Sequence, residues 1–226
     1  MKKDFPWLFR VLDPRMWLHD FIKWTGALPV VLYFRTKKIY INGKKPKRLT
    51  KGKVIIMANH FSFSDPIVVA TAFWYRRVGF VATKDLFKNK LLTFLFKGYA
   101  CVPVDKENVS MKTFMGVKEI LRRGHSMAVF PEGGIKTESE VQGFKSGLAM
   151  MATISQADIV PTYICKRTKW WKRQRIYVGE RIKLSDYINS PFPPLKEIEA
   201  LTKVLYEREK ELERFAIEKG DASHGC

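Results

Sequence analysis

Short apolar runs that alternate with helical patterns constrain the fold of this chain more than any other feature of its sequence. The runs are partly β-branched and bounded by glycine, proline or charged residues, which is typical of buried strands. The predicted strands cover residues 54–58, 78–82, 100–104, 126–130, 159–164 and, at an edge of the sheet, 174–178. The predicted helices cover residues 66–75, 84–96, 110–123, 144–155 and 195–218. This alternation predicts an α/β domain with a mostly parallel mixed sheet flanked by helices.

The N-terminal part of the chain carries a different pattern, so we predict a helical segment over residues 1–36 and a domain over residues 37–226. Trp17, Phe21, Trp24 and Leu28 fall on one helical stripe, and the longest uncharged run nearby has 11 residues. That run is well short of the roughly 20 residues needed to span a bilayer. An amphipathic helix with aromatic rings is typical of the membrane interface. A helix that packs on its own domain would show the same stripe.

Basic residues dominate the charge of the chain, which is +19 at pH 7. Such an excess indicates an anionic partner: a membrane surface, a phosphate-bearing substrate, an acidic carrier protein or nucleic acid. Eight basic residues follow the predicted N-terminal helix: Lys37, Lys38, Lys44, Lys45, Lys47, Arg48, Lys51 and Lys53. Beside an interfacial helix they favour binding to an anionic leaflet. We therefore expect the protein on the cytoplasmic face of the cell membrane, as a peripheral or monotopic protein.

A second basic stretch, residues 166–175, contains six basic residues and the adjacent Trp170 and Trp171. As a loop after a strand it could enter the lipid headgroup layer or receive an acidic carrier protein. It could also stack on single-stranded nucleic acid, or be a solvated hairpin with its tryptophans against the core. The three cysteines are odd in number and lack C-x-x-C spacing, which predicts a reducing compartment with no disulfide framework and no metal site.

His60 and Asp65 are the first candidates for chemistry. The segment between them directly follows the predicted strand 54–58, and Asp65-Pro66 predicts a helix start with Asp65 as the N-cap. Residues five apart in a regular helix point about 140° apart, so the two side chains meet only if the chain bends there. Paired, they would form a general base with a carboxylate that orients it. A loop histidine beside a capping aspartate would give the same spacing.

A glycine-rich turn, Phe130-Pro131-Glu132-Gly133, follows another predicted strand 70 residues after His60. Backbone N–H groups in such a turn can bind phosphate, although an ordinary strand-to-loop turn has the same composition. Together the two segments resemble the glycerolipid acyltransferase family, whose members acylate lysophosphatidic acid or glycerol 3-phosphate. Residues 59–65 match its N-H-x-S-x-x-D block, and residues 98–106 resemble its glycine, strand and aspartate–arginine block. Residues 130–136 resemble its F-P-E-G-T-R-S block, and residues 159–161 match its I-V-P strand.

The resemblance implies transfer of an acyl group from acyl-CoA or an acidic acyl carrier protein to 1-acyl-glycerol 3-phosphate, giving phosphatidic acid. It implies no cofactor beyond that co-substrate and no metal, and it leaves nucleic acid without a role. His60 and Asp65 would be catalytic. The residues implied in binding the lysophospholipid acceptor are Lys106, Glu132, Gly133, Gly134, Lys136 and Lys145.

Two positions depart from the family pattern. Lys106 stands where the family has an arginine, and Gly134-Ile135 stand where it has threonine and arginine. Lysine keeps the positive charge but loses the bidentate geometry of a guanidinium, and isoleucine loses both. Two alternatives therefore stay open: an acyltransferase for another acceptor, such as glycerol 3-phosphate or another lysophospholipid, and a membrane-associated relative without activity.

Overall fold

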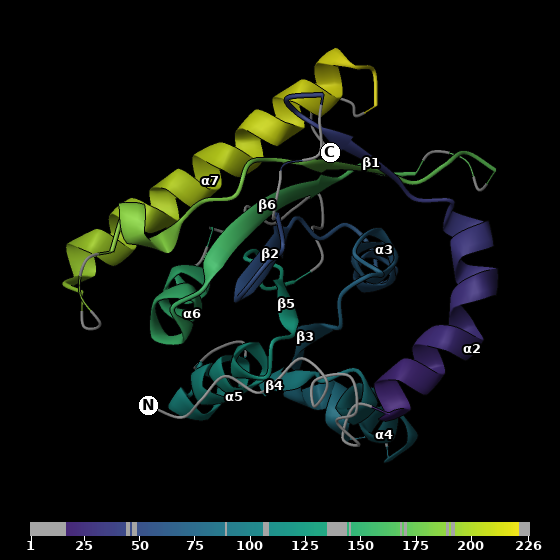
Figure 1. The fold of residues 1–226 in the computed structure, drawn as a ribbon, viewed down its shortest axis with the longest axis horizontal. Coiled ribbons are helices and arrows are strands. Elements are labelled where there is room, and N and C mark those ends of the chain that lie inside the picture. Colours follow the sequence, from purple (N-terminus) through teal and green to yellow (C-terminus); the bar gives the residue numbers. More distant parts are fainter. Residues whose placement is uncertain are drawn as a thin grey trace.

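The computed structural model describes residues 17–43, 46, 49–88, 90–105, 109–134, 144, 146–167, 169, 171–188, 190 and 193–221. Its strands form one seven-stranded sheet in the order β1-β7-β6-β2-β5-β3-β4 (Figure 1). The strands are β1 (Lys37–Tyr40), β2 (Val54–Ala58), β3 (Val78–Thr83), β4 (Val102–Val104), β5 (Ser126–Val129), β6 (Asp158–Ile164) and β7 (Arg175–Val178). The α/β fold with a mostly parallel mixed sheet is thus confirmed.

The edge of the sheet differs from the sequence prediction. Strands β2 to β6 are mutually parallel, β7 is antiparallel to β6, and β1 is parallel to β7. The strand expected at the edge is therefore internal, because β1 covers it. Lys37 and Lys38 of β1 had counted only as part of a polybasic run. Lysine on an edge strand is common, since its charge prevents the strand from pairing with another chain.

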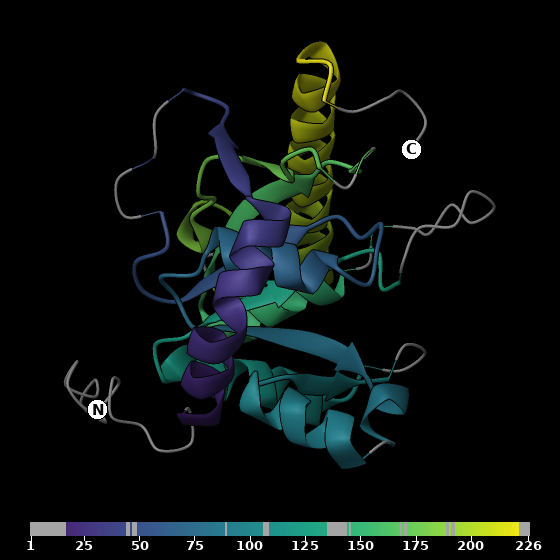
Figure 2. The same ribbon diagram turned by 90° about the vertical axis from the view of Figure 1, so that its right-hand side faces the viewer.

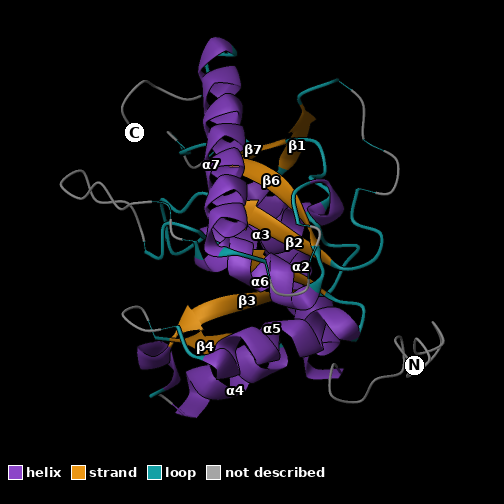
Figure 3. Ribbon diagram, turned by 90° about the vertical axis from the view of Figure 1, so that its left-hand side faces the viewer, coloured by secondary structure: helices purple, strands orange, loops and turns teal. Residues whose placement is uncertain are grey.

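Helices cover both faces of the sheet (Figures 1 and 3). One face carries α5 (Met111–Arg122), α6 (Gly147–Ser155) and α7 (Leu195–Glu218), and the other carries α2 (Trp17–Phe34) and α3 (Asp65–Ala72). The helix α4 (Lys90–Gly98) lies beyond β4, and short 3₁₀ turns lie at η2 (Lys84–Phe87) and η3 (Leu184–Asp186). The expected helix over residues 84–96 is thus divided into η2 and α4, and the helix expected at 66–75 ends at Ala72.

The core forms on both faces because the central strands alternate their side chains between them. Ile55 and Met57 of β2 pack with α5, α6 and α7, whereas Val54, Ile56 and Ala58 pack with α3. All five residues of β2 are buried, which is why the run is continuously apolar. Helix α7 buries the periodic residues Ile198, Leu201, Leu205, Leu212 and Ala216 and exposes its charged face. Its ends coincide with the predicted ones.

Helix α2 lies against the domain (Figure 2), and some of its apolar side chains are exposed. Asp20 forms an ion pair with Arg77, just before β3. Trp17 and Phe21, by contrast, are 63% and 66% exposed. No helix among the described residues is long and apolar enough to cross a bilayer. Residues 1–16 lie outside the described residues, so the N-terminal start of the predicted segment is not described.

Candidate active site

The predicted site lies where the parallel strands β2, β5 and β6 end. Met57 of β2 is in register with Val129 of β5, and Ala58 is in register with Thr162 of β6. The carboxyl ends of parallel strands meet at one edge, which is where open α/β sheets bind ligands. The segment that follows β2 and the turn that follows β5 therefore come together at this edge.

Asn59 fixes the start of the His60 segment. Its side-chain Nδ2 donates to the carbonyl of Ile164 at 3.0 Å, and its Oδ1 accepts from the Ile164 amide at 2.6 Å. The residue is fully buried. Because both bonds go to the last residue of β6, Asn59 closes the sheet at this edge and sets the position from which His60 projects. Sequence reasoning gave Asn59 no role beyond the motif match.

His60 and Asp65 do meet. Nδ1 of His60 lies 3.0 Å from Oδ2 of Asp65, and the side chains are 16% and 5% exposed. The same Oδ2 accepts the amide hydrogens of Phe61 at 2.6 Å and Ser62 at 2.7 Å. These bonds fix the carboxylate, and the carboxylate in turn fixes the ring.

The prediction that Asp65 is the helix N-cap is wrong. Ser64 occupies the N-cap position and Asp65 is the first residue of α3, with Pro66 next to it. The carboxylate turns back toward the residues before the helix, because it accepts the amides of Phe61 and Ser62. This backward orientation is what brings Asp65 to His60, so the correction strengthens the pairing.

The turn after β5 holds the other side of His60. The Phe130 ring stacks on the imidazole with centroids 4.4 Å apart and an interplanar angle of 22°. Oε2 of the buried Glu132 accepts the backbone amide of His60 at 3.3 Å. Glu132 therefore contacts the His60 segment, whereas the family resemblance implied only a role in binding the acceptor. Gly133 has φ of 73°, a left-handed conformation that favours glycine, and its amide closes the turn onto Phe130 at 3.1 Å.

Two features define what the pair can do chemically. Nε2 of His60 has no hydrogen-bond partner among the described residues, so it is available to a substrate hydroxyl. The hydroxyl of Ser62 lies 3.1 Å from that of Ser64, and no described contact joins it to His60. The arrangement therefore fits a histidine that activates a substrate directly, and it gives no serine nucleophile.

The residues implied in binding the acceptor are placed only in part. Glu132, Gly133 and Gly134 lie at this edge, while Lys106, Lys136 and Lys145 lie outside the described residues. The structure adds Lys84, whose Nζ pairs with Asp105 Oδ2 at 2.9 Å, where β3 and β4 end. Lys84 lies two residues after the end of the predicted strand 78–82, and it was not among the residues predicted to bind the acceptor.

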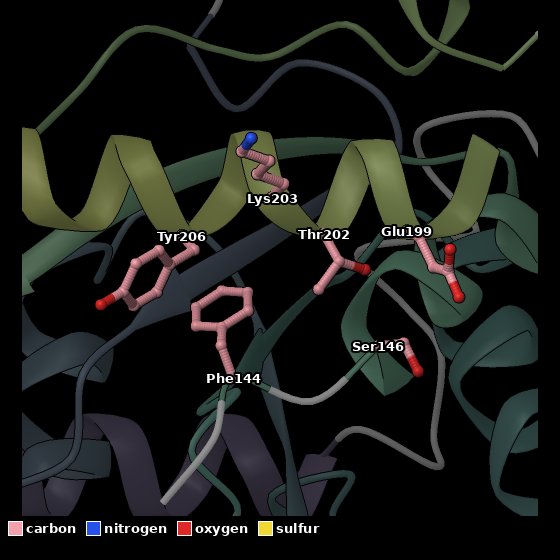
Figure 4. Close-up of a pocket in the computed structure, with 6 residues that line it drawn as sticks. All are labelled: Phe144, Ser146, Glu199, Thr202, Lys203 and Tyr206. Carbon is pink, nitrogen blue, oxygen red and sulfur yellow. The ribbon is translucent and has the colours of Figure 1, made fainter. Parts of the chain in front are cut away.

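Neither His60 nor Asp65 lines the hollow found at the start of α6. Within the described ranges, no three His, Cys, Asp or Glu side chains are grouped to hold a metal ion. A hollow of about 410 Å³ lies instead between the start of α6 and α7, where Phe144 faces Tyr206 (Figure 4). Ser146, Glu199, Thr202 and Lys203 complete its lining. The candidate site is therefore identified by its hydrogen bonds and its place at the sheet edge.

Comparisons with known proteins identify the family of the chain. The family model for acyltransferases matches residues 38–165. The 1-acyl-sn-glycerol-3-phosphate acyltransferase of Bacillus subtilis is 26% identical over 83% of this chain and 94% of that protein. The probable 1-acyl-sn-glycerol-3-phosphate acyltransferase of Mycoplasma pneumoniae is 26% identical over 70% of this chain and 65% of that protein. The crystal structure of the 1-acyl-sn-glycerophosphate acyltransferase PlsC from Thermotoga maritima aligns with a TM-score of 0.62 and 20% identity, over 89% of this chain and 80% of that one. That likeness shows the fold.

Proposed function

The chain belongs to the acyltransferase family and is an O-acyltransferase, and we propose that its acceptor is 1-acyl-glycerol 3-phosphate. The reaction moves a fatty acyl group from a thioester to the free hydroxyl of that lysophospholipid and gives phosphatidic acid. The observation that carries the proposal is the His60–Asp65 pair at 3.0 Å with Nε2 of His60 open. The printed names of the relatives support the choice of acceptor.

His60 is the general base of the proposed reaction. With the Nδ1 hydrogen donated to Asp65, the lone pair of the ring lies on Nε2. Nε2 takes the proton of the acceptor hydroxyl while the oxygen attacks the acyl carbonyl. The imidazolium that forms is stabilised by the carboxylate of Asp65, and its proton then passes to the leaving thiolate of coenzyme A or acyl carrier protein.

The oxyanion of the tetrahedral intermediate needs N–H donors. The amides of His60, Phe61 and Ser62 are already donated to Glu132 and Asp65, and that of Gly133 to Phe130. These four amides therefore already have acceptors within the protein. Gly134 is left with an amide that no described residue accepts, and we assign it as an oxyanion donor.

The acceptor phosphate would be bound by cations where β3, β4 and β5 end. Lys106 and Lys136 follow these strands in sequence, and Lys145 precedes α6. Ile135, at the family's arginine position, favours a second candidate function: acylation of a different acceptor, glycerol 3-phosphate or another lysophospholipid. No cofactor is required in either case, because the acyl thioester brings the activated group.

We also propose a peripheral or monotopic place for the protein on the cytoplasmic face of the cell membrane. The exposed Trp17 and Phe21 of α2 and the charge of +19 support binding to an anionic surface. The acceptor is itself a membrane lipid, so the enzyme meets its substrate at that surface.

A purified-enzyme assay tests the proposed function. Lysophosphatidic acid, glycerol 3-phosphate and other lysophospholipids are offered as acceptors, each with acyl-CoA and with acyl carrier protein as donor. We expect the highest kcat/KM on lysophosphatidic acid, and we expect His60→Ala to remove turnover while its thermal melting matches that of the wild type. A folded His60→Ala protein with near wild-type turnover would contradict the mechanism. A higher kcat/KM on another acceptor would favour the second candidate.

A further inference from the structure

Aromatic, aliphatic and basic side chains gather on a surface formed by two segments that are far apart in the sequence. One is the C-terminal end of α2, and the other joins β6 to β7. Leu32, Tyr33 and Trp171 on this surface are 63%, 52% and 54% exposed. The basic–aromatic surface, as we call it, consists of Leu32, Tyr33, Arg35, Arg167, Lys169, Trp171, Lys172 and Arg173.

Specific contacts hold the two segments together. The guanidinium of Arg167 lies over the Tyr33 ring, 4.4 Å from its centroid, and donates to the Tyr33 carbonyl at 3.3 Å. Arg35 donates in the other direction, to the carbonyl of Trp171. The amide of Gln174 donates to Phe34 at 2.9 Å, and its carbonyl accepts from Lys37 at 2.8 Å. These contacts fix the two segments relative to each other, so the fold itself forms the surface.

The position of this surface relative to the candidate site follows from the sheet. Asn59 is bonded to Ile164, the residue before the second segment begins, and His60 follows Asn59. Phe63, between His60 and Asp65, is exposed as well. The basic–aromatic surface thus lies at the same end of the sheet as the candidate active site. A lipid substrate that moves from a membrane to His60 would pass beside the basic–aromatic surface.

The composition of the surface indicates what binds there. Residues 31–37 and 165–175 contain no aspartate or glutamate, so the surface is complementary to negative charge. Binding of an acidic protein would require only the basic side chains of this surface, and it would not account for the exposed apolar ones. Exposed leucine, tyrosine and tryptophan among the cations also suit the headgroup layer of a bilayer, where aromatic rings lie between water and hydrocarbon. The exposed Trp17 and Phe21 continue the apolar side of α2 away from this point.

We infer that the basic–aromatic surface docks on an anionic lipid bilayer and holds the candidate active site beside the membrane. This inference rests on the proposed function, in which the acceptor is a membrane lipid. Arg167 connects the two segments, and Lys169, Lys172, Arg173 and Trp171 meet the headgroups. The exposed Trp17 and Phe21 near the other end of α2 would contact the same bilayer.

Vesicle binding tests the inference with matched variants. The surface variant carries Lys169→Gln, Lys172→Gln and Arg173→Gln. The control variant carries Lys112→Gln, Lys118→Gln and Lys196→Gln, three exposed lysines on α5 and α7, on the opposite side of the sheet from α2. Both lose the same charge. Each protein is sedimented with vesicles of phosphatidylcholine and phosphatidylglycerol and assayed on a short-chain lysophosphatidic acid that stays dissolved.

Each cation near an anionic leaflet contributes about fivefold to partition, so we expect the surface variant to bind about a hundredfold more weakly than the wild type. The control variant should bind much more strongly than the surface variant, and high salt should reduce the difference. Trp171→Ala should weaken binding at high salt too, because its contribution is not electrostatic. All variants should keep wild-type kcat on the dissolved acceptor.

Several results would overturn the inference. Equal partition of the surface and control variants would remove the docking role. Normal vesicle binding with a rate loss only when acyl carrier protein is the donor would assign the surface to that acidic protein. A rate loss on the dissolved acceptor would assign it to support of the catalytic domain. Partition needs no turnover, so a wild-type protein inactive on every acceptor would contradict the proposed function separately.

Discussion

Asn59 and Ile164, 105 residues apart in sequence, exchange two hydrogen bonds at the end of the sheet, at 2.6 Å and 3.0 Å. These bonds attach the residue just before His60 to β6, in addition to its covalent link to β2. Because Asn59 is fully buried, its removal leaves the amide and carbonyl of Ile164 without a partner or a route to water.

Asn59→Ala should therefore cost about 3 kcal/mol of unfolding free energy and lower kcat, because His60 loses its support. Urea unfolding and steady-state assays measure the two effects. Thr162→Val is the matched control on β6, since it removes a single buried bond, from Thr162 Oγ1 to the Met57 carbonyl at 2.7 Å. We expect it to cost about 1 kcal/mol and to leave kcat nearly unchanged. An Asn59→Ala protein with wild-type kcat would show that the clamp does not position His60.

Asp65 offers a test of charge separate from geometry. Asp65→Asn keeps an oxygen that can accept from His60, Phe61 and Ser62, but it removes the negative charge that stabilises the imidazolium. We expect a loss of roughly 10⁴-fold in kcat with little change in thermal melting, by comparison with the effect of the same change in a serine-protease triad. Asp65→Ala should lose stability as well, because two backbone amides then lack their acceptor. Turnover of Asp65→Asn within a few fold of wild type would reduce Asp65 to a structural role.

The local part of this site could be predicted from the sequence, and the long-range part could not. The strand before His60 and the turn after β5 are visible because apolar runs and glycine-rich turns are local patterns. The predicted role of Asp65 as the helix cap was wrong. Asp-Pro is typical of a cap, but the carboxylate accepts hydrogen bonds from the amides of Phe61 and Ser62, which precede it. The stacking of Phe130 on His60 depends on how β5 pairs with β2. No spacing along the chain encodes that pairing.

The same distinction applies to the fold. The pattern of α7 is strongly periodic over its whole length, so its ends were predicted. Strand β1 was missed because Lys37-Lys38-Ile39-Tyr40 has no apolar run, and it forms only because β7 offers a partner in register. The division between η2 and α4 has no glycine or proline in the sequence to mark it.

Two cysteines should be chemically silent in the folded protein. Burial raises the pKa of the Cys101 thiol and that of the Cys165 thiol to about 12, from an ordinary value near 8.5–9. In a Cys226→Ser background, we expect no rapidly titrating thiol at pH 8 with a disulfide reagent, and two after denaturation. Cys226 itself lies outside the described residues. Rapid reaction of either thiol in the native protein would contradict the burial of these side chains.

The same raised pKa values give a sign for the pH dependence of stability. Between about pH 9 and 12 the unfolded chain releases these thiol protons while the folded chain keeps them, so the unfolded state is favoured as the pH rises. Below about pH 8 both thiols are protonated in the folded and the unfolded chain, so their effect on the unfolding free energy no longer changes with pH. A double Cys101→Ala, Cys165→Ala protein should lose less unfolding free energy between pH 8 and pH 10 than the wild type, as urea unfolding at the two pH values would show.

Lys106 should set the affinity for the acceptor phosphate. It follows Asp105 directly, where β4 ends, although Lys106 itself lies outside the described residues. Lys106→Ala should raise the acceptor KM about tenfold and leave the KM of the donor unchanged, because the lost contact concerns one substrate only. Lys106→Arg should lower the acceptor KM, since it restores the bidentate geometry of the family's arginine. Lys112→Ala, an exposed lysine on α5, is the control. Unchanged acceptor kinetics in Lys106→Ala would move phosphate recognition to another cation, and Lys84 beside Asp105 is the next to test.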